Sequence, residues 1–206
     1  MPPAFLYFDL GNVLLYFSHE QGCRQIAEVA GISPEQVRSV LFSSGLQDRC
    51  ERGELNGHEL YRVFCEHSGT QGEFDRLEQA GNEIFTCNQS MIPLLGHLHV
   101  ARHRMGILSN IGQSHWNYVS SGRYGIITEP FEIQVLSFEV GAIKPDRKIF
   151  EHAAEKAGVA PSEIFYTDDR AENVGAAREF GFDAVQYTST MALARELHKR
   201  GVRSNF

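Results

Sequence analysis

The sequence predicts an α/β fold, a three-layer sandwich built on a mostly parallel sheet, with an all-helical segment inserted after the first strand. Two patterns predict it. In the C-terminal part of the chain, short continuous apolar runs alternate with stretches of helical periodicity, and such runs are typical of strands buried on both faces. Strands that alternate with helices form a parallel sheet covered on both faces. Residues 18–89, in contrast, have helical periodicity and no convincing strand.

The first strand is expected at Ala4 to Phe8, a continuous apolar run that stops at Asp9. The turn-forming pair Gly11-Asn12 follows it. Capping boxes at Ser18-His19-Glu20-Gln21 and Ser33-Pro34-Glu35-Gln36 then mark two helix starts, the second with proline at the first helical position. Apolar residues with i, i+3, i+4 spacing continue to Phe85, so we expect four or five helices in this segment.

The alternation of helix and strand resumes after this segment. We expect strands at 105–108, 132–137, 164–167 and 184–187, and helices at 92–100, 113–120, 146–157, 171–180 and 191–200. Gly158 and Gly181 directly follow two of these helices, where glycine commonly ends a helix. The expected division is therefore a core of residues 1–15 and 91–206 and a helical segment of residues 16–90.

The composition excludes several classes of protein. The 206 residues include 19 basic and 26 acidic side chains, and the net charge of −7 argues against a general nucleic-acid or anionic-membrane binder. No apolar run reaches the ~18 residues that cross a bilayer, and the N-terminal residues lack the features of a secretory signal. The four cysteines have no metal-ligand spacing. We therefore expect a cytoplasmic protein with reduced cysteines, as a monomer or a weak homodimer.

Polar residues directly follow three of the predicted strands. They are Asp9 after the first strand, Ser109-Asn110 after the second and Asp168-Asp169 after a later one, and Lys144-Pro145 lies in a loop before a helix. In an open α/β sheet, ligands bind outside the carboxyl ends of the strands. Taken singly, each residue also has a structural explanation as a turn residue, a helix cap or a surface lysine.

Taken together, these residues predict a site for phosphoryl transfer. Three carboxylates at one sheet edge repel one another unless a cation lies among them, and hard oxygen ligands suit Mg²⁺. A hydroxyl, backbone N–H groups and a lysine beside that cation make an anion site. A carboxylate nucleophile, a Mg²⁺ site and an anion site are the groups that phosphoryl transfer requires.

Four segments resemble, in order, the motifs of the haloacid dehalogenase (HAD) superfamily. They are Phe8-Asp9-Leu10-Gly11-Asn12-Val13-Leu14, Ile107-Leu108-Ser109-Asn110, Lys144-Pro145 and Phe165-Tyr166-Thr167-Asp168-Asp169. The resemblance covers essentially the whole chain. It implies a Rossmann-like core with residues 16–90 in the place of the family's helical cap.

The resemblance implies a catalytic or binding role for each of these positions. Asp9 matches the nucleophile that forms an aspartyl-phosphate. Ser109 and the Asn110 backbone match phosphate-binding donors. Lys144 matches the lysine that neutralises the nucleophile and also binds the phosphate.

The same resemblance implies a Mg²⁺ site. Asp169 matches the family's metal carboxylate, and Asp9 and the backbone carbonyl of Gly11 match the other metal contacts. Asp168 is implied either as an auxiliary ligand or as a residue that supports the metal ligands without binding the ion. Asn173 matches a polar residue that often holds a metal-bound water.

Gly11 departs from the pattern of most phosphatases in this superfamily. They carry a second aspartate there, two residues after the nucleophile, and it acts as the general acid and base. Such a group is commonly worth about 10²–10⁴-fold in rate. His19, Glu20 or His115 could supply the proton instead. Alternatively, the substrate has a good leaving group, such as an anomeric sugar phosphate or an acyl phosphate, or the protein only binds.

The Asp-Leu-Gly-Asn-Val-Leu segment and Glu51-Arg52-Gly53-Glu54 resemble a subgroup that includes glucose-1-phosphate phosphatases. The favoured interpretation is a Mg²⁺-dependent phosphatase whose partner is a small phosphorylated metabolite, a sugar phosphate. Two alternatives remain open. One is a metal-independent 2-haloacid dehalogenase, against which the acidic pair Asp168-Asp169 argues. The other is a non-catalytic phosphate-binding member of the superfamily.

Overall fold

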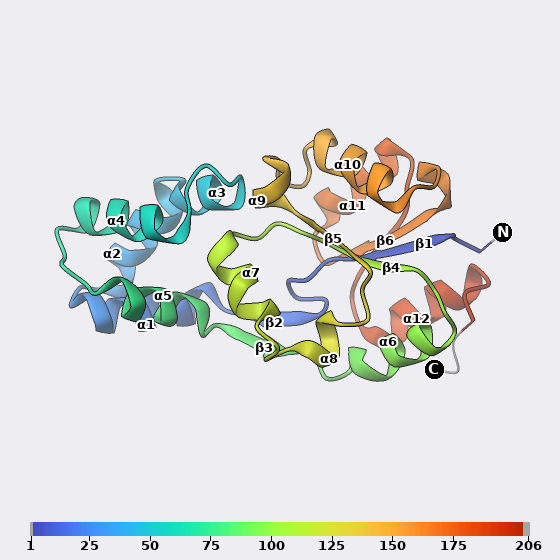
Figure 1. The fold of residues 1–206 in the computed structure, drawn as a ribbon, viewed down its shortest axis with the longest axis horizontal. Coiled ribbons are helices and arrows are strands. Elements are labelled where there is room, and N and C mark those ends of the chain that lie inside the picture. Colours follow the sequence, from blue (N-terminus) through green and yellow to red (C-terminus); the bar gives the residue numbers. More distant parts are fainter. Residues whose placement is uncertain (1, 204–206) are drawn as a thin grey trace.

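A five-stranded parallel sheet forms the centre of the computed structural model, which describes residues 2–203. The terminal residues of the predicted core, 1 and 204–206, lie outside the described residues. The strands are β1 (Phe5–Phe8), β4 (Met105–Ser109), β5 (Ile133–Leu136), β6 (Ile164–Asp168) and β7 (Asp183–Gln186). Their spatial order is β5-β4-β1-β6-β7, and all four pairings are parallel. The carboxyl ends of all five strands therefore lie along one edge (Figure 1).

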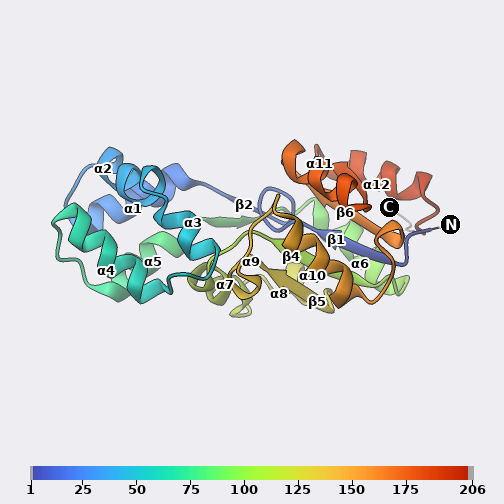
Figure 2. The same cartoon turned by 90° about the horizontal axis from the view of Figure 1, so that it is seen from above.

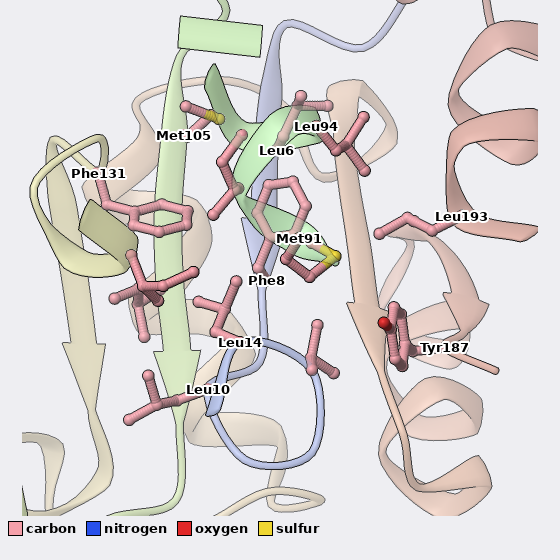
Figure 3. Packing of buried hydrophobic residues seen from close by; sticks show 14 of the residues in the cluster. Leu6, Phe8, Leu10, Leu14, Met91, Leu94, Met105, Phe131, Tyr187 and Leu193 are labelled. Atoms are coloured by element: carbon pink, nitrogen blue, oxygen red, sulfur yellow. The ribbon is translucent and has the colours of Figure 1, made fainter. Parts of the chain in front are cut away.

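The central strand β1 is buried on both faces of the sheet. Phe5 and Tyr7 belong to the apolar cluster on one face, whereas Leu6 and Phe8 belong to the cluster on the other. None of the four is more than 1% exposed. Figure 3 shows Leu6 and Phe8 beside Met91 of the neighbouring helix layer. This burial explains why the strand reads as a continuous apolar run rather than an alternating one.

Helices cover both faces of the sheet (Figure 1). The helices of the first layer are α6 (Met91–Val100), α8 (Gly125–Thr128) and α12 (Thr190–Lys199), and those of the second are α10 (Arg147–Ala157) and α11 (Ala171–Phe180). The short elements α7 (Gln113–Ser120), α9 (Ser137–Val140) and η2 (Pro161–Glu163) complete this part of the chain. The predicted sandwich with a parallel sheet is confirmed.

The helical segment has a separate apolar core. Its elements are α1 (His19–Ala30), α2 (Pro34–Arg38), η1 (Ser39–Ser43), α3 (Leu46–Glu51), α4 (Gly57–Ser68) and α5 (Phe74–Asn82). Val37, Phe64 and Leu77 are fully buried within it. Figures 1 and 2 place these helices at one end of the molecule, beyond the carboxyl edge of the sheet.

Two antiparallel strands connect this segment to the sheet. β2 (Leu15–Phe17) pairs with β3 (Phe85–Cys87). We expected no strand in residues 18–89 and helical periodicity as far as Phe85. This expectation was wrong near the end of the segment, where β3 lies. α5 already ends at Asn82. The strand β3 depends on a partner far earlier in the chain, which local periodicity does not reveal.

The local signals for helix starts and ends were mostly correct. Ser33 forms the complete capping box with Gln36, whereas Ser18 forms only half of one, because the Gln21 side chain donates to Glu83 O instead. The helices expected at 113–120 and 171–180 have those bounds, and Gly181 ends the second. In the described part of the chain, no helix is long and apolar enough to cross a membrane.

Candidate active site

One cavity at the carboxyl edge of the sheet brings most of the predicted site residues together. β1, β4 and β6 lead into Asp9, Ser109 and Asp168, and the loop before α10 supplies Lys144. The predicted residues that line the cavity are Asp9, Gly11, His19, Ser109, Asn110, His115, Lys144, Asp169 and Asn173. Asp168 lies just beneath, fully buried. The sheet topology explains this convergence. β4 and β6 lie on either side of β1 in a parallel sheet, so the carboxyl ends of the three strands are neighbours.

Lys144 is buried between two carboxylates. Its Nζ donates to Asp9 Oδ1 at 2.7 Å, to Asp168 Oδ2 at 2.8 Å and to the Leu108 carbonyl at 2.9 Å. Burial disfavours the charged amine, but the charges of Asp9 and Asp168 outweigh it and raise the pKa of Lys144. The lysine is therefore a fixed positive charge at the floor of the cavity.

Asp9 accepts its two hydrogen bonds on one oxygen. Oδ1 receives the Leu10 N–H at 2.7 Å as well as the Lys144 ammonium. Burial raises the pKa of Asp9 to about 7, and the neighbouring charges of Asp168 and Asp169 act in the same direction, while Lys144 opposes them. The charge of Lys144 thus does not fully offset the effects of burial and of the neighbouring carboxylates on Asp9, and a further cation would favour its ionised form.

Asp168 is saturated with hydrogen-bond donors. Its oxygens accept from Lys144 Nζ, the Tyr166 hydroxyl, the Arg170 N–H and the Asn173 amide. Burial tends to raise the pKa of Asp168, but Lys144, the Tyr166 hydroxyl and the Arg170 N–H hold it below its ordinary value. Asp168 is therefore ionised, and its hydrogen bonds hold the donor residues in place around it.

Three carboxylates form a group that suits a divalent cation. One oxygen each from Asp9, Asp168 and Asp169 lies within 4.8 Å of the other two. Asp169 is the least buried of the three, and its Oδ2 accepts from the Asn12 amide at 3.0 Å. Asn173 places a buried Oδ1 beside the group, and this atom has no hydrogen-bond partner in the described part of the chain. An all-oxygen donor set of this kind fits Mg²⁺.

Asn110 has a structural role that its sequence position did not reveal. Its side-chain amide donates to the Lys144 carbonyl at 2.9 Å and accepts the Lys144 N–H at 2.7 Å. These two bonds fix the Lys144 loop against the end of β4. The neighbouring Ser109 hydroxyl is buried at the cavity and contacts the Asn110 carbonyl at 3.4 Å. Sequence reasoning assigned only the backbone of Asn110.

The space beside Gly11 is filled by an aromatic ring. A Cβ atom at Gly11 would lie 2.8 Å from Cε1 of Phe17, so a longer side chain there requires the ring to move. The next residue, Asn12, adopts φ 55°, a left-handed conformation in which asparagine is enriched. That turn directs its amide to Asp169. Neither Asn12 nor Phe17 was identified as a site residue from the sequence.

The three candidates for a replacement acid differ in their position. His115 and His19 line the cavity, whereas Glu20 is not among the lining residues and is paired with Arg24 at 2.6 Å. Burial lowers the pKa of His115 to about 4, and its Nε2 donates to the Gly81 carbonyl at 3.2 Å. Burial and then Arg38 lower the pKa of His19 as well. Both imidazoles are therefore neutral at pH 7. Among the cavity residues that sequence reasoning missed are Gln47 and Glu51.

Comparison with known proteins agrees with this geometry. A model of the haloacid dehalogenase-like hydrolase family matches residues 6–181. The chain is 21% identical to D-ribitol-5-phosphate phosphatase of Bacteroides thetaiotaomicron over 187 residues, which are 88% of this chain and 90% of the relative. It is 30% identical to (S)-2-haloacid dehalogenase 1 of Pseudomonas sp. strain CBS-3, but over 114 residues that are only 54% of this chain and 48% of the relative.

A crystal structure has the same fold. It is a HAD family enzyme of Bacteroides thetaiotaomicron in complex with magnesium and inorganic phosphate, with a TM-score of 0.80 and 24% identity. The superposition covers 91% of this chain and 96% of that chain. Because the family model matches most of the sequence and the four motifs converge on one cavity, the resemblance is confirmed. The chain belongs to the haloacid dehalogenase-like hydrolase family.

Proposed function

We propose that this protein is a Mg²⁺-dependent phosphatase that hydrolyses a small phosphorylated metabolite, a sugar phosphate. The observation that carries the proposal is the buried Lys144–Asp9 pair, 2.7 Å apart, at a cavity that Ser109 and Asp169 also line. A carboxylate, a cation, a hydroxyl and a second carboxylate are the groups that phosphoryl transfer requires. The relative named D-ribitol-5-phosphate phosphatase, with a phosphorylated sugar alcohol in its name, supports the substrate class.

In this proposal Asp9 is the nucleophile. Both of its hydrogen bonds are accepted by Oδ1, so Oδ2 is the oxygen that attacks phosphorus. The bond from phosphorus to the leaving oxygen breaks as the aspartyl-phosphate forms, and Lys144 and Ser109 stabilise the phosphoryl oxygens. Water then attacks the aspartyl-phosphate, which releases inorganic phosphate and regenerates Asp9.

The residues that would hold Mg²⁺ are Asp9, Asp169 and the backbone carbonyl of Gly11. When bound, the ion supplies positive charge that offsets the carboxylates and the phosphate oxygens. Of the two roles implied for Asp168 from the sequence, we infer that it supports the site without binding the ion. Its oxygens already accept from Lys144, Tyr166, Arg170 and Asn173, so it positions Lys144.

We also infer that residues 16–90 are a cap over a core of residues 1–15 and 91–206. His19, Gln47 and Glu51 from that segment line the same cavity as Asp9 and Lys144. A segment with its own apolar core is suited to cover the substrate and to determine which organic group fits.

Phosphate release with Mg²⁺ and with EDTA tests the proposed function. We expect release from a panel of sugar phosphates, nucleotides and acyl phosphates to require Mg²⁺ and to stop when EDTA is added. Halide release from 2-haloacids in the presence of EDTA would instead indicate the dehalogenase alternative. Binding of inorganic phosphate without turnover of any substrate would indicate a protein that only binds.

Mg²⁺ is also expected to stabilise the fold. A ligand that binds only the folded state at 100 times its Kd adds about 2.7 kcal/mol to the free energy of unfolding. The increase in Tm should be larger at pH 8 than at pH 6, because at pH 6 the cation must displace a proton from Asp9, whose pKa is raised to about 7. Asp169→Asn should remove most of the increase and the exposed control Asp75→Asn should retain it. Equal Tm values in Mg²⁺ and EDTA would contradict the assigned metal site.

A further inference from the structure

The two residues that follow α3, Arg52 and Gly53, contact elements that surround the five-stranded sheet. Arg52 donates to Asp146 at 2.8 Å, and Asp146 lies only two residues after Lys144 in the chain. Gly53 has φ 71°, and a Cβ atom there would lie 2.1 Å from the Phe138 carbonyl of α9, so only glycine allows this approach. These contacts fix the position of the preceding residue, Glu51, relative to the loop that carries Lys144.

Glu51 lines the same cavity as Asp9, Ser109 and Lys144. It is half-buried, and its Oε1 accepts from the Gln47 amide at 3.1 Å. Gln47 lies one turn before Glu51 on the same helix, so this hydrogen bond restrains the Glu51 carboxyl group. The other carboxyl oxygen, Oε2, takes no part in the bond. Two residues after Asp9, in contrast, the chain has Gly11, and the ring of Phe17 fills the space beside it.

We propose that Glu51 is the general acid and base of the reaction, in place of the carboxylate that Gly11 cannot provide. The proposal rests on the phosphatase function above. In the first step Asp9 attacks phosphorus, the phosphorus–oxygen bond to the leaving group breaks, and the leaving oxygen takes the Glu51 proton to become a hydroxyl. In the second step the Glu51 carboxylate takes a proton from water as that water attacks phosphorus. Asp9 leaves as a carboxylate, and Glu51 is protonated again.

The charges around Glu51 suit this role. Burial raises its pKa, and Asp48 on the same helix acts in the same direction, whereas the Gln47 amide, Lys144 and Arg170 oppose them. A carboxyl group with a raised pKa carries a proton closer to the pH at which the enzyme works. The two cavity histidines are less suitable proton donors, because burial lowers the pKa of both His115 and His19.

The test compares Glu51→Gln with Glu54→Gln in the full chain with Mg²⁺. Glu54 is in the same segment, but it is exposed and paired with Arg49 at 3.3 Å, so it is the matched control. The substrates are aryl and alkyl phosphates whose leaving groups differ in pKa, with p-nitrophenyl phosphate at the acidic end. Melting temperatures of both variants establish that the fold is intact.

We expect kcat/KM of Glu51→Gln to fall about 10²–10⁴-fold for alkyl phosphates and less than about tenfold for p-nitrophenyl phosphate, whose leaving group needs no proton. Turnover of p-nitrophenyl phosphate should nevertheless slow, because water attack lacks its base. A burst of p-nitrophenol equal to the enzyme concentration, with phosphate retained on the protein after acid quenching, should precede the slow phase.

Each other outcome overturns a specific claim. If wild-type protein is active and Glu51→Gln behaves like Glu54→Gln, the role of Glu51 is wrong and the phosphatase function stands. An equal loss for all leaving groups without a burst assigns Glu51 to substrate binding and also overturns the proposal. If wild-type protein and both variants release phosphate from none of the esters, the phosphatase function itself fails.

Discussion

Asp9→Asn is expected to reduce phosphate release about 10⁴-fold or more, because the reaction then has no oxygen nucleophile at the end of β1. The fold should be retained. The amide oxygen of asparagine still accepts from the Leu10 N–H and from Lys144, as Oδ1 of Asp9 does. Lys144 also keeps its bond to Asp168.

The stability of this variant follows from the pKa of Asp9. Burial raises it to about 7, so the folded state binds this proton more tightly than the unfolded state. Ionised Asp9 therefore lowers the free energy of unfolding as the pH rises from about 4 to above 7, and asparagine removes that cost. We expect a Tm at pH 8 equal to or above that of the wild type, measured without Mg²⁺.

Activity and Tm together make the result decisive. The exposed Asp75→Asn in α5 is the control and should retain both wild-type activity and Tm. Turnover by a folded Asp9→Asn protein close to that of the control would show that another residue is the nucleophile. Loss of activity with loss of the fold would show that Asp9 supports the structure more than its hydrogen bonds indicate.

The residues that the sequence could reveal are those positioned by the sheet itself. Asp9, Ser109 and Asp168 each follow or end a continuous apolar run, and parallel pairing of β1, β4 and β6 is sufficient to bring them together. Lys144 is less predictable, because it lies on a loop. Its place depends on the Asn110 side chain, a contact across 34 residues of sequence that no local pattern indicates.

The contacts between the helical segment and the rest of the chain were beyond local sequence reasoning. Helical periodicity predicted the helices, but it did not show which of their faces reach the cavity. Glu51 was noted only as part of a motif. Its place at the cavity depends on contacts distant in sequence, those of Arg52 with Asp146 and of Gly53 with Phe138. Likewise, Phe17 reaches the space beside Gly11 because β2 pairs with the distant β3.

Lys144→Met is expected to lower the free energy of unfolding by about 3–5 kcal/mol and to abolish turnover. Removing one partner of a buried ion pair leaves an uncompensated charge, and methionine replaces the aliphatic stem without the ammonium group. Here two carboxylates, Asp9 and Asp168, lose the same cation. The exposed Lys148→Met on α10 is the matched control and should change stability by less than about 0.5 kcal/mol.

The pH dependence of this loss tests its electrostatic origin. In the wild type, Lys144 holds the pKa of Asp168 below its ordinary value. The ionised carboxylate therefore stabilises the fold at pH values above the ordinary carboxyl pKa, and this stabilisation is lost as the pH falls through the lowered pKa. Without Lys144 the pKa values of Asp9 and Asp168 both rise, so the folded state binds their protons more tightly than the unfolded state. The loss of unfolding free energy should therefore be larger at pH 8 than at pH 5 in urea unfolding without Mg²⁺.

Adding Asp168→Asn to Lys144→Met should recover part of this loss at pH 8, since one buried charge is removed. A loss that is equal at both pH values and unchanged in the double variant would mean that Lys144 stabilises the fold by packing, and the buried charge pair would no longer support the proposed active site.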